Sequence, residues 1–231
     1  MYPTTGPGAP IDLLLADAYI EPYYDSQERP TAAERIARLA AREQEGAMRQ
    51  RMRAEREQLA YELDMTCALV LAHPNAAAVL ARLVNRRDLE PEGALVFGSL
   101  LHLTGRDQAC RFWWQFAAGS GNHLAAYCLY LHHGRAGRDK DAEHWRAEAK
   151  ELRAGTRPAV SSPRPRSQGP LLARRVYLDI LAQCYRGNRP QLPVDVEAVI
   201  NQLLVECDDI DFGEIPQPSP QLHTALLARA A

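Results

Sequence analysis

One short stretch of this sequence contains side chains whose types and spacing could bind a metal ion. Cys128 and His132 are four residues apart, so on a helix they would share one face, a spacing compatible with Zn²⁺. A closed zinc site needs two more ligands, and His102 or His144 would have to converge on this pair. His133, which precedes a glycine, fits the favourable position of an imidazole at a helix C-terminus. We therefore predict no metal site.

The motifs of well-known enzymes are absent from the sequence. There is no nucleophile elbow of the G-x-S-x-G type, no H-E-x-x-H helix, and no glycine-rich loop of the kinds that bind phosphate or dinucleotides. Scattered carboxylates leave room for an enzyme, but no constellation of them indicates one. We therefore expect a protein that is not an enzyme and that uses no cofactor.

Arginine is concentrated in one segment of the chain. Between residues 34 and 62 there are seven Arg and six Glu, so the charges nearly cancel. Arg49, Arg53 and Arg56 are our candidates for contacts with a partner. Alternating charge on a helix more often marks a solvated or coiled-coil flank than a DNA-binding surface. A DNA-associated transcriptional regulator that uses the Arg-rich helix 35–56 is therefore the alternative function.

Four aromatic rings occur within residues 112–116. Three of them would share one helix face, whereas Trp114 would point about 100° away. Packing in the core explains all four rings. The alternative is that Trp114 lines a binding groove as an anchor, which makes it a candidate for partner binding.

A second apolar candidate lies near the N-terminus. Residues 11–20 form an apolar, acid-flanked segment that includes Leu14 and Tyr19. Such a segment either docks as a cap on the chain's own helices or inserts as a short helix into the groove of a partner. Leu14 and Tyr19 are therefore further candidates for partner binding.

The composition favours an all-α protein. The 36 Ala and 29 Leu are strong helix formers, whereas the β-branched Val and Ile number only 10 and 7. No apolar run approaches roughly 18 residues, so we predict no membrane span. Five cysteines without a C-x-x-C pair fit a reducing compartment, and we expect a cytoplasmic protein. The net charge of −2 gives no whole-chain attraction to nucleic acid.

Proline divides the chain, because it terminates helices. Its clusters indicate a mostly flexible N-terminal segment at 1–30, a Pro/Arg-rich linker at 155–170, and an acidic, Pro-rich tail with a short terminal helix at 207–231. Between them lie a helical array at 31–154 and a two-helix unit at 171–206. Two helices bury too little surface to fold alone, so we expect this unit to pack on the array or on a partner.

The array is predicted to begin with a long helix at 31–73, followed by hairpins at 75–154. Thr31 and Glu34 are spaced as a capping box at the start of this helix. Its thin apolar stripe among Arg and Glu indicates that it projects from the body or pairs with another helix. A homodimer with a coiled coil through residues 31–60 would satisfy the second option.

An internal repeat follows the long helix. The sequence T-G-R-D at 104–107 recurs as A-G-R-D at 136–139, and A-x-x-F-W at 109–113 is matched by A-x-x-W at 142–145. Small residues at fixed positions let two helices approach closely, while an aromatic residue fills the groove to the next pair. Over residues 92–154 the chain resembles the tetratricopeptide (TPR) superfamily, and more narrowly its Sel1-like variant.

The resemblance implies a short right-handed stack of helical hairpins, in which Trp113 and Trp145 would occupy equivalent positions. An irregular helical bundle that contains two similar hairpins is the alternative. We thus predict an all-α, TPR/Sel1-like fold with a long N-terminal helix and capping C-terminal helices. Because the family shares no catalytic residues, the resemblance also implies a non-enzymatic, regulatory scaffold that binds a protein or peptide.

Overall fold

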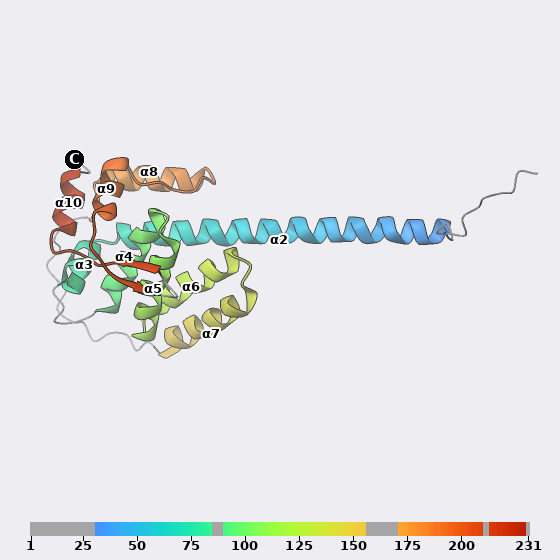
Figure 1. The fold of residues 1–231 in the computed structure, drawn as a ribbon, viewed down its shortest axis with the longest axis horizontal. Helices are drawn as coiled ribbons and strands as arrows, with labels where there is room; N and C mark the ends of the chain where they lie inside the picture. The colour runs from blue at the N-terminus through green and yellow to red at the C-terminus, as the bar shows by residue number, and fades with distance from the viewer. Residues whose placement is uncertain (1–30, 85–89, 156–170, 210–212, 230–231) are drawn as a thin grey trace, which may run out of the picture. The chain divides into compact units, whose positions relative to one another are not determined.

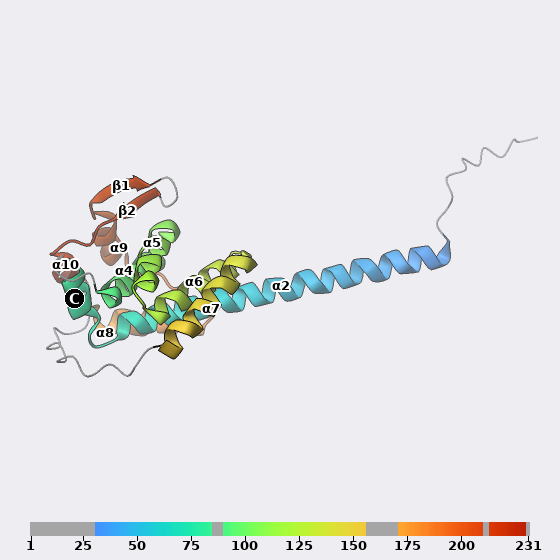
Figure 2. The ribbon, with the colours of Figure 1, turned by 90° about the horizontal axis from the view of Figure 1, so that it is seen from below.

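The structure is a computed structural model that describes residues 31–84, 90–155, 171–209 and 213–229. By its internal contacts the chain divides into two compact units, residues 1–48 and 49–231. The described elements, labelled in Figures 1 and 2, are α2 (Ala32–Ala72), α3 (Ala76–Val84), α4 (Pro91–Leu103), α5 (Asp107–Gly119), α6 (His123–Arg135), α7 (Asp139–Gly155), α8 (Arg174–Tyr185), α9 (Val194–Asn201), β1 (Val205–Asp209), β2 (Gly213–Pro216) and α10 (Leu222–Arg229).

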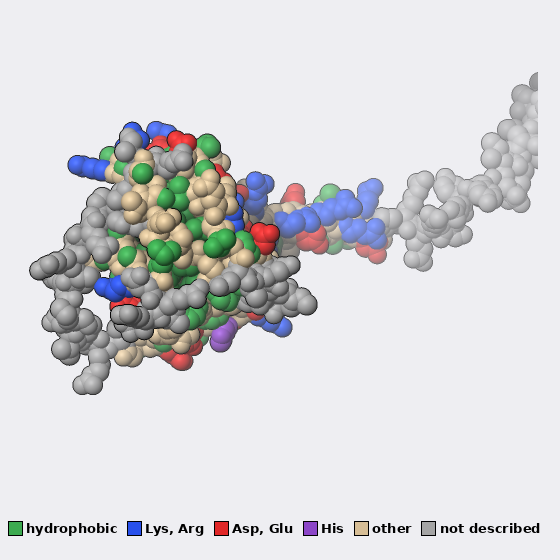
Figure 3. Space-filling view, turned by 60° about the vertical axis from the view of Figure 1, so that its left-hand side comes forward, with side chains coloured by type: hydrophobic (Ala, Val, Ile, Leu, Met, Phe, Trp, Pro, Cys, Tyr) green, Lys and Arg blue, Asp and Glu red, His purple; other side chains and the backbone are tan. Residues whose placement is uncertain are grey.

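In the first unit, the described residues form the beginning of α2. The predicted capping box is present: the Glu34 N–H donates to Thr31 Oγ1 at 3.2 Å, and the Thr31 N–H donates to Glu34 Oε2 at 2.8 Å. Residues 32–48 are all exposed. Arg and Glu side chains are interspersed along the exposed part of α2 (Figure 3). The helix predicted at 31–73 agrees with α2 to within one residue at each end.

In the second unit, each helix from α3 to α6 packs against the next helix along the chain (Figure 1). The pairs α4–α5 and α6–α7 make the most extensive contacts, and α5 packs on α6 to join them. The described residues thus form a helical protein with a long first helix and pairwise packing of neighbours, which confirms the all-helical prediction in this coarse form.

Two glycines make the turns within these pairs. Gly105, between α4 and α5, has a φ of 76°, and Gly137, between α6 and α7, has a φ of 71°, a conformation that favours glycine. In both turns the next residue, Arg106 or Arg138, donates its N–H to the carbonyl five residues earlier at 3.0 Å. The repeated G-R-D sequence therefore forms the same Schellman-type turn twice.

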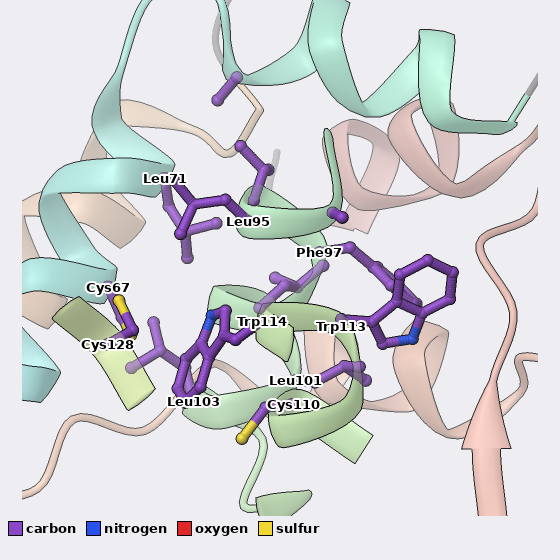
Figure 4. Close-up of a cluster of buried hydrophobic side chains, with 14 of the residues drawn as sticks. Cys67, Leu71, Leu95, Phe97, Leu101, Leu103, Cys110, Trp113, Trp114 and Cys128 are labelled. Atoms are coloured by element: carbon purple, nitrogen blue, oxygen red, sulfur yellow. The ribbon is translucent and has the colours of Figure 1, made fainter. Parts of the chain in front are cut away.

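The core lies between the end of α2 and the pair α4–α5 (Figure 4). Phe97 on α4 meets Trp113 on α5 edge to face, with ring centroids 5.1 Å apart. The Trp113 indole N–H donates to the Pro216 carbonyl on β2 at 3.2 Å. An aromatic residue of the array thus holds the C-terminal part of the chain.

The C-terminal helices share this core. Val176 and Ile180 on α8 and Val196 on α9 belong to the same buried cluster as the array. The Tyr177 hydroxyl donates to the Leu71 carbonyl at the end of α2 at 2.6 Å. Helix α10 packs on α9 and α3 (Figure 2). The residues predicted as a two-helix unit are therefore buried against the array.

The C-terminal region departs from the all-helical prediction. Helix α9 ends at Asn201 rather than near residue 206, and β1 pairs with β2 as an antiparallel hairpin. On β2, Ile215 is buried and Pro216 accepts the hydrogen bond from Trp113. The acidic composition of this segment concealed the hairpin, because the strands depend on packing against α5 rather than on strong β propensity.

The predicted equivalence of Trp113 and Trp145 is not seen in the packing. Trp113 is 6% exposed and meets Phe97 and Phe112 edge to face. Trp145 is only partly buried, and its ring lies 5.2 Å from that of His144. The turns of the two hairpins repeat, but the surroundings of the two indoles do not, so the packing does not confirm a repeat stack.

Within the described ranges, no single helix is both long and apolar enough to cross a membrane. Helices α2 and α3 together satisfy that test of length and composition, but the chain bends by 84° between them. Leu63 and Leu71 of α2 and Leu80 of α3 are buried in the protein core.

Candidate functional site: an arginine-lined cleft

A cleft rich in arginine lies in the second unit, where residues 49–60 of α2 face the start of α5 and the end of α6. Its volume is about 900 Å³, a size typical of ligand sites. We call it the arginine cleft. Its lining residues are Arg49, Met52, Arg53, Arg56, Glu57, Ala60, Asp107, Gln108, Arg111, His132, Arg135, Ala136 and Arg138.

Helix α2 brings three of the predicted partner-binding residues to this cleft. Arg49, Arg53 and Arg56 are separated by four and then three positions, so they share one helix face and all line the cleft. Arg51, in the same segment, is not part of the lining. It pairs with Glu55, with Nε and Oε1 3.4 Å apart.

The other three arginines of the cleft come from elements distant in the sequence. Arg111 lies on α5, Arg135 at the end of α6, and Arg138 in the turn before α7. None of these three arginines is among the site residues predicted from the sequence. Arg138 could have been noticed, because it belongs to the repeated G-R-D turn. The other two have no such local signal, because their approach to α2 depends on tertiary packing.

The lining of the cleft has a formal excess of four positive charges, since six Arg face only Glu57 and Asp107. Arg53 Nε donates to Glu57 Oε1 at 2.9 Å, which neutralises one of the six. His132 adds no charge at neutral pH, because burial and the nearby Arg135 lower its pKa to about 3. The cleft is therefore a concave site that attracts anions.

Asp107 organises the inner wall of the cleft. Its Oδ1 accepts a hydrogen bond from Arg135 Nη2 at 2.6 Å. Burial alone would raise the pKa of the Asp107 carboxyl, but the charge and the hydrogen bond of Arg135 outweigh burial, and the pKa is lowered. Asp107 is therefore ionised at neutral pH and holds the Arg135 guanidinium in place.

Gly137 allows Arg56 to lie close to the turn between α6 and α7. A Cβ at position 137 would stand 2.5 Å from Arg56 Nη2, so any side chain there would displace the guanidinium. The Nε of the adjacent Arg138 is buried and has no hydrogen-bond partner among the described residues. A buried donor of this kind in a cationic wall is suited to an anionic acceptor.

Behind Asp107 lies a buried histidine on α4. His102 Nε2 is 2.7 Å from Asp64 Oδ1, and His102 Nδ1 is 3.8 Å from Asp107 Oδ1. Burial lowers the pKa of His102, so the ring is neutral at physiological pH. His102, Asp107 and Cys110 each contribute one potential ligand atom. These three atoms lie within 4.8 Å of one another, close enough to hold a metal ion.

Trp114, predicted as a candidate groove anchor, is a core residue. Its side chain is fully buried between His102 and His132, whose ring centroids are 5.6 and 6.0 Å from its own. Gly98 makes room for the indole, since a Cβ there would lie 2.7 Å from Trp114 Cδ1. The anchor interpretation is therefore corrected, because Trp114 exposes no surface to a partner.

The remaining sequence candidates are not brought into the arginine cleft. Leu14 and Tyr19 lie outside the described residues. Cys128 lies beside Cys67 in the core (Figure 4). His132 Nδ1 is instead 3.3 Å from Arg135 Nη2, so Cys128 and His132 are not members of the group of potential metal ligands found among the described residues.

Comparison with known proteins gives no matching family model and no match among curated proteins or solved structures. The function proposed for the arginine cleft therefore rests on the geometry and charge of the cleft itself.

Proposed function

We propose that this protein is a non-enzymatic, cytoplasmic scaffold that binds an acidic segment of a partner protein in the arginine cleft. The observation that carries this proposal is the convergence of six arginines from three separate parts of the chain on one concave site. Each guanidinium offers several N–H donors in a planar fork that matches a carboxylate. An extended peptide with several Asp or Glu residues would engage several of these forks at once.

An acidic peptide suits the cleft better than DNA does. The arginines stand on the walls of a hollow, whereas proteins that read DNA present a helix or a positively charged surface to the groove and the backbone. Outside the cleft, the exposed Arg51 is paired with Glu55, which dilutes the positive field along α2. The chain as a whole has a net charge of −2.

The helical hairpins provide the framework for this site, and we propose that they are a short TPR/Sel1-like stack. What supports this is the position of the turns at Gly105 and Gly137, each of which begins the second helix of a pair at the same point of the repeated sequence, whereas the turn geometry itself also occurs at Gly121 and Gly187. Arg138, from the second of these turns, lines the cleft. In this proposal the repeated turn contributes to binding, since it orients Arg138 toward the cleft.

A homodimer through residues 31–60 remains part of the proposal. Ile36 and Leu39 on α2 are 67% and 58% exposed, and Met48 is 62% exposed. Apolar side chains on an otherwise charged helix are typical of a coiled-coil seam.

Light scattering of the wild type and of an Ile36→Asp, Leu39→Asp variant measures the molar mass of the protein in solution directly. The proposal predicts a dimer that the substitutions convert to a monomer, and a monomeric wild type contradicts it.

Peptide binding can be tested with two matched charge reversals. Fluorescence anisotropy would measure the affinity for a labelled Glu-rich peptide of the wild type, an Arg56→Glu variant and an Arg51→Glu variant. Both substitutions change the net charge equally and lie on the exposed surface of the same helix, but only Arg56 lines the cleft. We expect Arg56→Glu to weaken binding by about tenfold or more and Arg51→Glu to change it little.

The same assay distinguishes the alternative function. A labelled DNA duplex is titrated under identical conditions, with the salt concentration varied. If the duplex binds more tightly than the peptide and Arg51→Glu weakens binding as much as Arg56→Glu does, the protein uses the whole Arg-rich helix on DNA and the proposal is wrong. Equal and weak binding of all three variants to the peptide would also contradict it.

A further inference from the structure

The environment of His102 leaves one of its ring nitrogens without a partner. The side chain has no exposed surface, and its Nε2 is 2.7 Å from the Asp64 carboxylate. Because the ring is neutral and the carboxylate accepts the Nε2–H, Nδ1 bears a lone pair. Nδ1 is buried and has no hydrogen-bond donor among the described residues. A buried acceptor without a donor costs free energy unless some other group satisfies it.

The groups that face this nitrogen are also electron-pair donors. The nearest Asp107 carboxylate oxygen is 3.8 Å from Nδ1, and the Cys110 sulfur belongs to the same group of ligand atoms within 4.8 Å of one another. A nitrogen lone pair, a carboxylate and a thiol therefore lie close together, although the Asp107 carboxylate already accepts from Arg135 and the Cys110 thiol donates to the Asp107 carbonyl at 3.2 Å. A cation placed between them would satisfy the unpaired Nδ1 and would take the place of the thiol proton.

The one ligand-atom distance that involves both His102 and Asp107 can be compared with that of a tetrahedral zinc site, and the Cys110 sulfur lies within 4.8 Å of both atoms. Zinc bonds of about 2.0 Å to nitrogen, 2.0–2.2 Å to oxygen and 2.3 Å to sulfur place neighbouring ligand atoms roughly 3.3–3.6 Å apart. The distance from His102 Nδ1 to Asp107 Oδ1 exceeds this by only a few tenths of an ångström. Asp107 and Cys110 stand three residues apart in the first turn of α5 and thus share one face.

We propose that His102 Nδ1, the Asp107 carboxylate and the Cys110 thiolate bind Zn²⁺, with Asp64 as a positioning residue. A histidine that binds a metal characteristically donates its other ring N–H to a carboxylate, which is the arrangement of His102 and Asp64. The three ligands leave a fourth position for water or for an anionic group. This proposal does not depend on peptide binding in the arginine cleft.

The charges around the proposed ligands are mixed, because the Asp64 and Asp107 carboxyl groups lie on one side and the Arg135 and Arg189 guanidinium groups approach Asp107 Oδ1 at 2.6 and 4.0 Å. Arg135 donates to Asp107 Oδ1, and hydrogen bonds to a ligating carboxylate are common around metal sites. Burial raises the pKa of the Cys110 thiol, so the metal-free thiol is protonated, and binding of Zn²⁺ as proposed would have to displace that proton to solvent. The alternative is a metal-free Asp64–His102 pair that serves only to hold α2 against α4.

Cobalt is a suitable probe, because Co²⁺ takes zinc sites and reports thiolate coordination by its absorption. The full-length protein, freed of metal with a chelator, is titrated with Co²⁺ and then with Zn²⁺. We expect a thiolate-to-cobalt charge-transfer band that saturates at one metal per chain and disappears when Zn²⁺ displaces Co²⁺. No charge-transfer band in the wild type would overturn the proposal.

Matched variants assign the ligands. Cys110→Ala should abolish the band, whereas Cys184→Ala, which removes another buried cysteine, should leave it unchanged. Asp64→Asn should weaken metal binding by about 10- to 100-fold, as expected for a partner of a ligating histidine. A band that persists in Cys110→Ala overturns the proposal. So does an Asp64→Asn variant with wild-type affinity.

Two further variants separate metal binding from folding and from peptide binding. Asp107→Asn retains the size of the side chain, and thermal unfolding of the metal-free variants shows whether they are folded. Added Zn²⁺ should raise the Tm of the wild type but not that of Asp107→Asn. Arg56→Glu should bind Co²⁺ like the wild type, so that failure of peptide binding and failure of metal binding can be told apart. An equal rise of Tm in Asp107→Asn contradicts the proposed ligand set.

Discussion

At the scale of single residues, the most unusual feature is the set of buried histidines around the arginine cleft. His102 and His132 lie on either side of Trp114, and His133 follows directly on α6. The pKa of each is lowered, in every case chiefly by burial. These rings are therefore neutral in the folded protein but titrate normally in the unfolded chain.

This difference predicts that the protein loses stability in mild acid. His132 has a pKa of about 3 when folded and about 6.5 when unfolded. Between these values the unfolded state binds the extra proton, so the free energy of unfolding falls as the pH is lowered from about 6.5 toward 3. The slope from one such group is at most about 1.4 kcal/mol per pH unit. Urea unfolding at a series of pH values measures it.

A His132→Gln variant provides the control for this prediction. The groups that face His132 are Arg135, Asp107, His102 and His133, and the two other histidines keep their own contributions. The variant should therefore lose part of the slope between about pH 4 and 6.5, whatever its stability at neutral pH. Identical slopes in the wild type and the variant would show that His132 does not titrate on unfolding.

At the scale of elements, the repeated turns connect the local sequence to the site. The turns at Gly105 and Gly137 have the same hydrogen bonds and similar φ. Their surroundings differ, because a Cβ at Gly105 would meet only Arg189 Nη2 at 4.0 Å, whereas a Cβ at Gly137 would collide with Arg56. The two positions therefore form a natural comparison.

We predict that Gly105→Ala and Gly137→Ala are both destabilising but affect binding differently. Each places an L-residue at positive φ, which costs about 1–2 kcal/mol. Gly137→Ala additionally displaces the Arg56 guanidinium, so it should weaken binding of the acidic peptide by several fold, while Gly105→Ala should not. Urea unfolding and fluorescence anisotropy measure the two effects. Equal peptide affinities of the two variants would argue against a role of Arg56 in the cleft.

The helices could be predicted because their signals are local. Proline positions and a capping box placed the bounds of α2 to within one residue, and the glycine turns separated the helices of the array. The hairpin of β1 and β2 could not be predicted in this way. Its segment is acidic, and its position depends on Trp113 and Pro216, which are 103 residues apart in the sequence.

At the scale of the whole molecule, the cleft combines residues that local spacing groups together with residues that only tertiary packing brings to it. Arg49, Arg53 and Arg56 share one helix face by their spacing, so the sequence identified them as a group. Arg111 and Arg135 join them only in the folded chain, where α5 and α6 line the cleft opposite α2. Helical spacing alone does not encode that arrangement, and for the same reason it could not decide whether Trp114 lies in the core or in a groove.

If the arginine cleft holds an acidic peptide, the guanidinium groups that line it must respond to the peptide, and NMR detects that response. The Nε–H resonances of the arginines are assigned and followed as an unlabelled Glu-rich peptide is added. We expect saturable shifts of the Arg53, Arg56 and Arg138 signals, which belong to the cleft, and little change at Arg51. Shifts confined to Arg51 and other arginines outside the cleft, with the cleft signals unmoved, would contradict it.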